Sequence, residues 1–306
     1  MHKLWDLVLA DAVATVGARR ILEIGADRGE CTRRLLAYCE AVGGHLDSVD
    51  PEPTFDVEAL RRRYASHLTF HRCPSLEALP RLRDLDAALI DGDHNWYTAF
   101  HELTLLERGA RAAGRDLPLV FLHDVGWPYG RRDMYYAPER IPPEFRQPCA
   151  QAGIVWGQSP LSDATPFNAK HWNALEEGGP RNGVLTAVED FVAQCASRPA
   201  LYVVPAYFGL GILVPPTLQQ HAPLLALLRH WDTEPGLRRL VEFAERVRLE
   251  DQVTTAEFEA ALEAQTAVVR ALEAELARIR HSRSWRLTEP LRAVSRLSRR
   301  FRAPYA

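Results

Sequence analysis

The sequence lacks three features that would each have defined its class. Its five cysteines form no C-x-x-C pair, which argues against a disulfide framework and against a cysteine-bound zinc site. The most apolar segment, residues 200–216, is too short to span a bilayer as a helix and is interrupted by proline and glycine. Asp6 and Asp11 interrupt the apolar stretch near the start, which argues against a signal peptide. We therefore expect a reducing, cytoplasmic setting.

The chain also has no strong excess of one charge. Its 306 residues carry a formal net charge of −3, so the charge of the whole chain favours neither nucleic acid nor a membrane as partner. The apolar content of 47% and the charged content of 25% are typical of a globular protein. We expect a main domain at 1–217 with an insertion at 126–183, a helical and coiled-coil extension at 218–280, and a basic tail at 281–306.

From residue 18 to about 125, short apolar runs alternate with segments whose apolar positions have helical spacing. This alternation predicts an α/β fold with a parallel sheet. Strands are expected at 19–25, 45–53, 68–72, 87–92 and 117–126, with helices at 26–41, 56–66, 75–82 and 96–110. A further helix is expected at 183–195, followed by two short strands within 200–215.

A glycine turn follows the first expected strand. In ILEIGADRGECT, Gly25 and Gly29 bracket a tight turn, where the backbone approaches a ligand closely and helix N–H groups point toward it. Asp50, which ends the next strand, stands where a carboxylate accepts hydrogen bonds from ribose hydroxyls. The pattern predicts a nucleoside site. Because it lacks the full G-x-G-x-x-G of a pyrophosphate binder, it favours S-adenosylmethionine over a nicotinamide dinucleotide, with a turn used only for packing as the alternative.

Acidic and imidazole side chains end the fourth and fifth strands. LIDGDH places Asp91, Asp93 and His94 after one strand, and FLHD places His123 and Asp124 after the next. Because ligands of open α/β sheets bind beyond the carboxyl ends of the strands, these side chains should face one crevice. A divalent ion held by carboxylates would lower the pKa of a bound hydroxyl, and an imidazole would take its proton. Asp93 is either a third ligand or a cap of the next helix, and a solvated strand rim is the alternative for the whole set.

These motifs resemble the class I S-adenosylmethionine-dependent methyltransferases, and among them the small O-methyltransferases typified by catechol O-methyltransferase and the macrocin-type sugar O-methyltransferases. The resemblance is specific over 20–125 and looser over 18–215. It implies a Rossmann-like, doubly wound, mostly parallel sheet with an antiparallel final strand, and a loop LEIGADRG at the methionine end of the cofactor. The cofactor-binding residues that it implies are Glu23, Gly25, Asp27, Gly29, Asp50, Ser75 and Asp91, with Asp50 at the ribose and Ser75 on the adenine side.

By the same resemblance, Asp91 binds a divalent metal, and His94, three positions later, is the general base. Asp124 matches a second metal carboxylate. His123 departs from the relatives, whose metal pair at this place is all oxygen, and imidazole is a poorer ligand for Mg²⁺. This departure leaves open whether the metal is Mg²⁺ or another divalent cation, and whether a metal is used.

The resemblance implies an O-methyltransferase that acts on a sugar hydroxyl of a surface glycan or a glycosylated metabolite, metal-assisted and with His94 as base. One alternative is a metal-independent methyltransferase of another small molecule. The other is a non-catalytic scaffold of a glycan-assembly complex. A scaffold needs no joint presence of the glycine turn, Asp50, Asp91 and His94, which favours catalysis.

Residues 126–183 are rich in aromatic residues and proline, and a connection of this length is usually functional, for example as a lid or an acceptor-binding segment. Its aromatic residues either stack on sugar rings or pack as core, and its arginines would meet phosphate or carboxylate groups. The residues concerned are Trp127, Tyr129, Tyr135, Tyr136, Arg131, Arg132 and Arg181.

Apolar residues recur at alternating spacings of four and three at Phe258, Leu262, Val269, Leu272, Leu276 and Ile279, with Gln265 at the remaining position. This spacing predicts either a coiled coil for self-association through 258–279 or a helix docked on its own domain. The tail 281–306 is basic and amphipathic, and its SWRLTEPLR resembles tails of bacterial enzymes of surface-polysaccharide assembly. We expect it to dock on the inner membrane surface or on an enzyme complex, with nucleic-acid binding and an unstructured end as the alternatives.

Overall fold

The computed structural model describes residues 1–163, 165 and 167–288. The chain divides into two compact units, Met1–Ala244 and Glu245–Ala306, and each is described by itself. The first unit contains the sheet and the candidate site. The domain boundaries at 217 and 280 stay predictions, and residues 289–306 of the expected tail lie outside the described residues.

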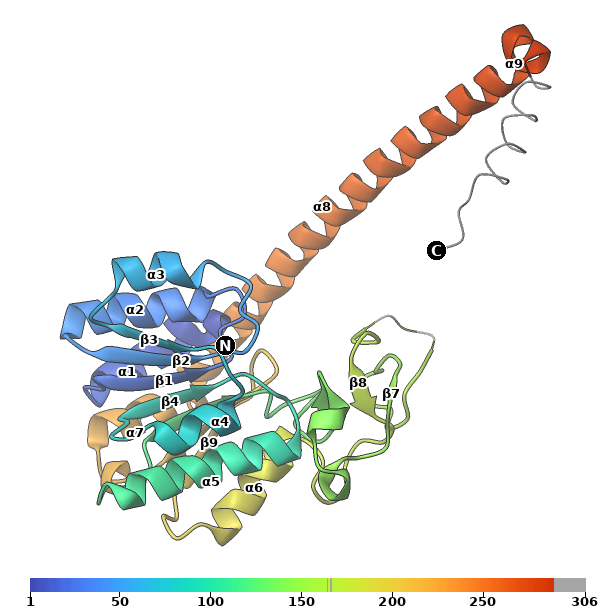
Figure 1. Ribbon diagram of the computed structural model, residues 1–306. Helices are drawn as coiled ribbons and strands as arrows, with labels where there is room; N and C mark the ends of the chain where they lie inside the picture. The colour runs from blue at the N-terminus through green and yellow to red at the C-terminus, as the bar shows by residue number, and fades with distance from the viewer. Residues whose placement is uncertain (164, 166, 289–306) are drawn as a thin grey trace, which may run out of the picture. The chain divides into compact units, whose positions relative to one another are not determined.

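A seven-stranded sheet in the order β3-β2-β1-β4-β5-β10-β9 forms the centre of the first unit (Figure 1). Its strands are β1 (Arg20–Ile24), β2 (His45–Val49), β3 (Leu68–His71), β4 (Ala87–Ile90), β5 (Leu119–His123), β9 (Ala200–Val204) and β10 (Leu210–Val214). The first five strands pair in parallel, and β10 runs antiparallel to both β5 and β9. The predicted mostly parallel, Rossmann-like sheet with an antiparallel final strand is confirmed.

Helices cover both faces of the sheet because its central strands are apolar on both sides. Every residue of β4 and β5 is buried, as expected of parallel strands that are covered on two faces. Figure 1 shows α2 (Glu30–Val42) and α3 (Val57–Arg63) on one side, and α5 (Trp96–Ala112) and α6 (Val184–Gln194) on the other. Other helices are α1 (Ala10–Thr15), α4 (Ser75–Ala78) and α7 (Ala222–Arg229), with the short turns His2–Leu4, Trp5–Leu9, Leu79–Arg81, Pro138–Arg140, Pro143–Phe145, Pro216–Leu218 and His230–Asp232.

Residues 126–183 contain a small second sheet in which β8 (Trp172–Ala174) pairs with β6 (Met134–Tyr135) and β7 (Cys149–Gln151). The buried Asp133 ties this segment to the main layer. Its Oδ1 accepts the backbone N–H of Trp96 at 2.7 Å and of Gly183 at 2.6 Å, and its Oδ2 accepts the Tyr135 hydroxyl at 2.7 Å. Because α5 and α6 both begin at this carboxylate, one side chain fixes the segment to two helices of the main domain.

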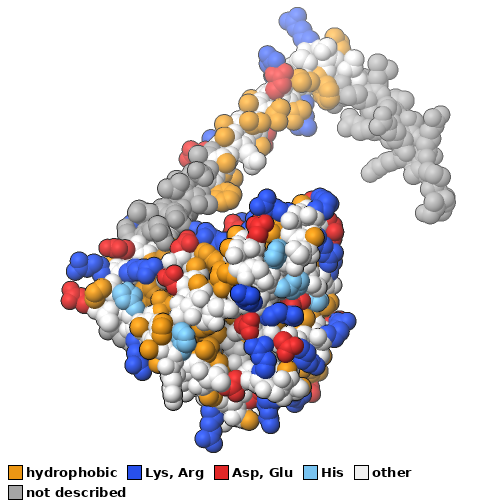
Figure 2. Space-filling model, turned by 90° about the vertical axis from the view of Figure 1, so that its left-hand side faces the viewer, with side chains coloured by type: hydrophobic (Ala, Val, Ile, Leu, Met, Phe, Trp, Pro, Cys, Tyr) orange, Lys and Arg blue, Asp and Glu red, His pale blue; other side chains and the backbone are white. Residues whose placement is uncertain are grey.

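Helix α8 (Glu234–His281) begins in the first unit, and α9 (Arg283–Leu287) follows it. Its buried Phe243 belongs to the first unit, whereas the described apolar side chains at 258 and 261–287 are exposed. Figure 2 shows apolar side chains along this helix, interspersed with charged ones. No helix in the part of the chain that the structure describes combines the length and the apolarity needed to cross a membrane.

Candidate active site

The strand register places the predicted residues side by side at one edge of the sheet. Ile24 of β1 pairs with Ile90 of β4, which pairs with Leu122 of β5. The residues that follow these three along the chain, and therefore lie side by side, are Gly25, Asp91 and His123. A Cβ atom on Gly25 would lie 2.1 Å from the carbonyl oxygen of Asp91, and Gly25 has a φ of +85°, so this position requires glycine.

A cavity of about 350 Å³ opens at this edge, within the size range of small-ligand sites. Six predicted residues line it: Gly25, Asp27, Asp91, His94, His123 and Asp124. Glu23, Gly29, Asp50 and Ser75 were also predicted, and they are not among the residues that line the cavity. Arg28, Glu30 and Cys31, from the same loop and the start of α2, line the cavity as well and were missed from the sequence.

Asp50 holds the glycine loop in place. Its Oδ2 accepts the backbone N–H groups of Ala26 and Asp27, both at 2.9 Å, and its Oδ1 accepts that of Glu52 at 2.8 Å. Each carboxylate oxygen has two lone pairs, so Oδ1 retains capacity for a ribose hydroxyl. The geometry is compatible with the predicted ribose contact, which stays a prediction.

Glu23 is a buried strut between β1, β2 and α2. Its Oε2 accepts the hydroxyls of Thr32 and Ser48, both at 2.7 Å, and burial raises the pKa of this carboxyl to about 7. Gly29 precedes α2 with a φ of +74°, directly beneath the ring of Phe55. Ser75 is the buried first residue of α4. These positions shape the loop from behind, and their contacts to the cofactor stay predictions.

The polar side chains at the ends of β4 and β5 form one continuous network. His123 Nδ1 lies 3.1 Å from Asp91 Oδ1 and 2.8 Å from Asp124 Oδ2. His94 Nδ1 lies 3.1 Å from the same Asp124 oxygen, and the Met1 ammonium lies 2.6 Å from Asp91 Oδ2. Asp124 has a φ of +60°, an uncommon conformation for a non-glycine residue that is often found at functional sites.

The protonation of this network follows from its charges. Burial alone would raise the pKa of Asp91 and Asp124, but the neighbouring imidazoles outweigh it and hold both carboxyl pKa values well below their usual range. Burial alone would lower the histidine pKa values, but the carboxylates outweigh it. They raise the pKa of His94 above 6.5 and that of His123 to about 9.

Asp91, His123 and Asp124 also have the geometry of a cation site. Each offers one ligand atom, and these atoms lie within 4.8 Å of one another. Two carboxylates and one imidazole fit a divalent cation that accepts both oxygen and nitrogen, such as Mn²⁺, better than they fit Mg²⁺. Because a metal ligand must be deprotonated, the residues fit a cation only when Nδ1 of His123 has given up its proton.

Asp93 belongs neither to this network nor to the helix cap. The cap of α5 is Asn95, whose side chain accepts the Thr98 backbone N–H at 2.9 Å. Asp93 instead accepts the Thr98 hydroxyl at 3.1 Å. The expectation that Asp93 caps this helix is therefore wrong, because the chain turns two residues later and places Asn95 at the capping position.

Aromatic rings also line the cavity, in contact with its two imidazoles. Tyr129 stacks on His94 with ring centroids 5.7 Å apart, and Tyr136 lies 6.2 Å from the same imidazole. Tyr207 and Phe208 come from the turn between β9 and β10, and their ring centroids lie 5.7 and 6.2 Å from that of His123. These two were missed from the sequence, although PAYFG between two strands could have indicated an exposed aromatic turn.

Other predicted side chains of the 126–183 segment contact partners outside the cavity. Tyr135 is buried as core, Arg131 pairs with Glu189 through two hydrogen bonds, and the buried Arg132 donates to backbone carbonyls. Arg181 lies over the ring of Trp96. Each of these three arginines therefore has a partner within the protein, and none of them lines the cavity.

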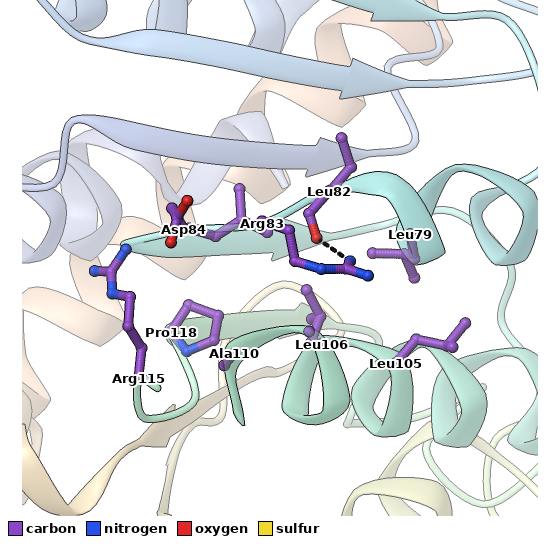
Figure 3. A pocket seen from close by; sticks show the side chains of 11 residues that line it. Leu79, Leu82, Arg83, Asp84, Leu105, Leu106, Ala110, Arg115 and Pro118 are labelled. Carbon is purple, nitrogen blue, oxygen red and sulfur yellow. Dashed lines mark hydrogen bonds between the residues drawn. The ribbon is translucent and has the colours of Figure 1, made fainter. Parts of the chain in front are cut away.

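A second hollow lies near the amino ends of β4 and β5, between Leu82 and Pro118 (Figure 3). Its volume of about 10 Å³ holds at most one water molecule. Arg83 crosses it and donates from Nη1 to the carbonyl of Leu82 at 2.6 Å. This hollow is too small for a substrate, so the cavity at the carboxyl ends is the better candidate.

Residues 22–125 match the family model of a methyltransferase domain, which covers β1 to the end of β5. No curated protein matches the chain. The matched residues contain Gly25, Asp50, Asp91, His94 and Asp124, the positions that the sequence motifs singled out.

Several solved structures are similar to this chain at low identity. The S-adenosylhomocysteine-bound methyltransferase PaMTH1 of Podospora anserina is 12% identical with a TM-score of 0.39, covering 67% of this chain and 76% of that one. The 1,6-didemethyltoxoflavin-N1-methyltransferase of Burkholderia thailandensis is 16% identical with a TM-score of 0.36, and the match covers 67% of this chain and 74% of that one. The O-methyltransferase NcsB1 from neocarzinostatin biosynthesis is 14% identical with a TM-score of 0.34, and the match covers 68% of this chain and 53% of NcsB1. Because these TM-scores are low, no argument about this chain rests on these structures.

Proposed function

We propose that this chain, in which residues 22–125 form a class I S-adenosylmethionine-dependent methyltransferase domain, is an O-methyltransferase that acts on a sugar hydroxyl of a surface glycan or a glycosylated metabolite. The observation that carries the proposal is the place of His94. Its imidazole lines the same cavity as the glycine loop and is paired with Asp124 through Nδ1. An imidazole held in this way has Nε2 left for proton transfer, which is the arrangement that a hydroxyl acceptor needs.

Each part of the cavity has a role in this proposal. Bound S-adenosylmethionine supplies an electrophilic methyl group. Gly25 lets the loop backbone approach the cofactor, and Asp50 accepts a ribose hydroxyl while it holds the loop. His94 takes the proton of the acceptor hydroxyl, and Asp124 orients the imidazole. Holding the acceptor oxygen in line with the methyl group supplies much of the acceleration.

The aromatic wall supports a sugar as acceptor. Tyr136, Phe167 and Phe208 line the cavity, and each remains at least 37% exposed. Aromatic faces of this kind pack against the apolar faces of sugar rings, while hydroxyls remain free to reach His94. The acceptor would therefore lie between this wall and the network at the strand ends.

Asp91, His123 and Asp124 would hold the divalent cation in the metal-assisted form of this proposal. The cation would lower the pKa of the acceptor hydroxyl and fix its position. A specific observation favours the second candidate, a metal-independent methyltransferase: His123 Nδ1 already lies within hydrogen-bond distance of both carboxylates. In that form the imidazolium supplies the positive charge, and His94 alone is the base.

The test is the release of S-adenosylhomocysteine with a panel of sugar, glycoside and catechol acceptors, each with excess chelator or with added Mn²⁺ or Mg²⁺. Turnover with a sugar acceptor that requires the added metal supports the metal-assisted form, and full turnover in chelator selects the metal-independent one. His94→Ala should lower turnover by roughly 10²–10⁴-fold, the usual contribution of a positioned base.

The matched control for His94→Ala is His71→Ala. His71 also pairs with an aspartate, through Nε2 to Asp47 Oδ1 at 2.9 Å, but it does not line the cavity. Its loss should leave turnover within a few-fold of the unchanged protein. An unchanged rate for His94→Ala at saturating acceptor would remove the base from the mechanism, and methylation of catechols alone would remove the sugar.

A further inference from the structure

The second unit carries an apolar stripe along α8, in a stretch where every residue from 261 to 281 is exposed. Six side chains form it, and each is between 41% and 73% exposed: Phe258, Leu262, Val269, Leu272, Leu276 and Ile279. With Gln265 they repeat at alternating spacings of four and three over 22 residues, about 33 Å of helix. The stripe ends where α8 ends, because Ser282 caps the next helix, α9. The pattern therefore occupies the C-terminal part of α8.

The stripe is as narrow as the contact between two helices. The positions between its members from Leu262 to Ile279 hold alanine, threonine, glutamate and arginine, with Val268 as the single larger apolar residue. A helix that docks on a globular domain has a broader apolar face, and larger helical assemblies also bury the flanking positions. Two chains are the assembly that covers this stripe without burying the flanking charges.

Gln265 and the flanking charges favour a parallel over an antiparallel pairing of the two helices. In a parallel, in-register pair, Gln265 faces its own copy, and the two amides satisfy each other. In an antiparallel pair centred on the same stripe, Gln265 would face Leu272 and leave a buried amide without a partner. Glu275 and Arg280 occupy the flanking positions, five residues apart, that face each other across a parallel pair and carry opposite charges.

We propose that two copies of this chain associate through residues 258–279 of α8 as a parallel, in-register coiled coil. This inference is independent of the proposed methyl transfer. The proposed dimer joins two copies of the chain through residues that do not line the candidate active site.

Disulfide trapping in the full chain tests the orientation. Ile279→Cys lies at one end of the stripe, so it meets its own copy only in a parallel, in-register pair. Mild oxidation should give a covalent dimer on a non-reducing gel, whereas Ala274→Cys, on the opposite face of the helix, should not. The unchanged chain gives the baseline, because it has five free cysteines. A mixture of Phe258→Cys and Ile279→Cys chains that yields only the mixed dimer would overturn the parallel arrangement.

Sedimentation equilibrium tests the partner and the stoichiometry. The full chain should have the mass of two copies, and Leu272→Lys should raise the dissociation constant at least about 100-fold, because each copy loses a central apolar contact. Ala274→Lys adds the same charge on the outer face and should leave the mass at two copies. Unchanged S-adenosylmethionine binding shows that each variant is folded. A monomeric or trimeric unchanged chain, or equal behaviour of the two lysine variants, would refute the proposal.

Discussion

Individual charges at the ends of β4 and β5 compensate one another. The carboxylates of Asp91 and Asp124 are in contact with the imidazoles of His94 and His123 and with the Met1 ammonium. In a buried place, removal of one partner leaves an uncompensated charge. Substitutions in this network therefore change the protonation of every other member, and activity data from them need a binding measurement beside them.

Asp50 lies outside the network and offers a cleaner test of the cofactor pocket. Asp50→Ala should weaken S-adenosylmethionine binding by on the order of 1–3 kcal/mol, because the ribose loses a charge-assisted hydrogen bond and the loop loses its anchor. Calorimetry measures this change, and nicotinamide dinucleotides should give no signal with either protein. Asp47→Ala removes a buried aspartate of β2, the strand that Asp50 directly follows, and this variant should bind the cofactor as the unchanged protein does. Equal affinities for Asp50→Ala and the unchanged protein would exclude the ribose contact.

The buried carboxyl group of Glu102 in α5 should make the free energy of unfolding depend on pH. Its carboxyl group is fully buried, and burial raises its pKa from about 4.5 to about 8, although a hydrogen bond with Ser75 acts in the opposite direction. Below pH 4.5 the group is protonated in both states; as the pH rises toward 8 it ionises only when unfolded, so folding stability falls. Glu102→Gln should remove this loss, making the variant more stable than the unchanged protein at pH 9 by on the order of 1–4 kcal/mol.

Urea unfolding of both proteins at pH 5 and pH 9 measures the effect. Glu107→Gln in the same helix is the control, since Glu107 accepts hydrogen bonds from Ser197. Parallel pH profiles for the unchanged protein and Glu102→Gln would contradict the prediction.

Among the elements, the small sheet β6-β8-β7 depends on Asp133 rather than on apolar packing alone. Asp133→Ala should lower the free energy of unfolding by on the order of 2–4 kcal/mol, because two buried backbone N–H groups and the Tyr135 hydroxyl lose their acceptor. Denaturant unfolding measures it. Asp163→Ala changes an exposed aspartate of the same segment and should cost far less. A loss as small as that of the control would show that the segment is held by other contacts.

The large elements were predictable from the sequence because their periodicity is strong. The five parallel strands and the helices between them lie within a few residues of their predicted places, and Gly25, Asp91, His94 and Asp124 meet because strand ends share one edge. The small sheet was not predicted. Its strands have two or three residues, and its pairing joins positions far apart in the chain through buried polar groups such as Asp133, which leave no periodic pattern.

Contacts made behind the site were also beyond the sequence. Asp50 accepts loop N–H groups and Glu23 accepts two hydroxyls, but the same residue types in the same strands would equally fit direct ligand contacts. The approach of Met1 to Asp91 joins residues ninety positions apart, and no local pattern announces it. Sequence reasoning located the edge of the sheet at which the predicted residues meet, whereas the contacts of each side chain depended on tertiary packing, and the predicted chemistry stays a prediction.

For the whole molecule, we propose that the tail at 281–306 docks the chain on an anionic membrane surface and is not needed for catalysis. It carries seven arginines and one acidic residue, and each basic residue near an anionic surface contributes about 1 kcal/mol. Deletion of the tail should leave turnover on a soluble acceptor unchanged and should abolish co-sedimentation with anionic vesicles at low salt. Binding of the full chain should also weaken at high salt, because the Debye length shortens. Equal sedimentation of both forms, or binding to nucleic acid alone, would refute membrane docking.

The position of β10 between β5 and β9 governs the order in which the chain folds during synthesis. β5, which ends at His123, pairs with β4 as soon as both strands have been made, but its other edge stays unpaired until Leu210–Val214 emerges. Closing so long a loop is slow, and an apolar strand with an open edge is a template for aggregation. The nascent chain therefore pairs the second side of β5 only after β10 has emerged. The interval between the synthesis of β5 and that of β10 is the stage of translation at which a chaperone would be needed most.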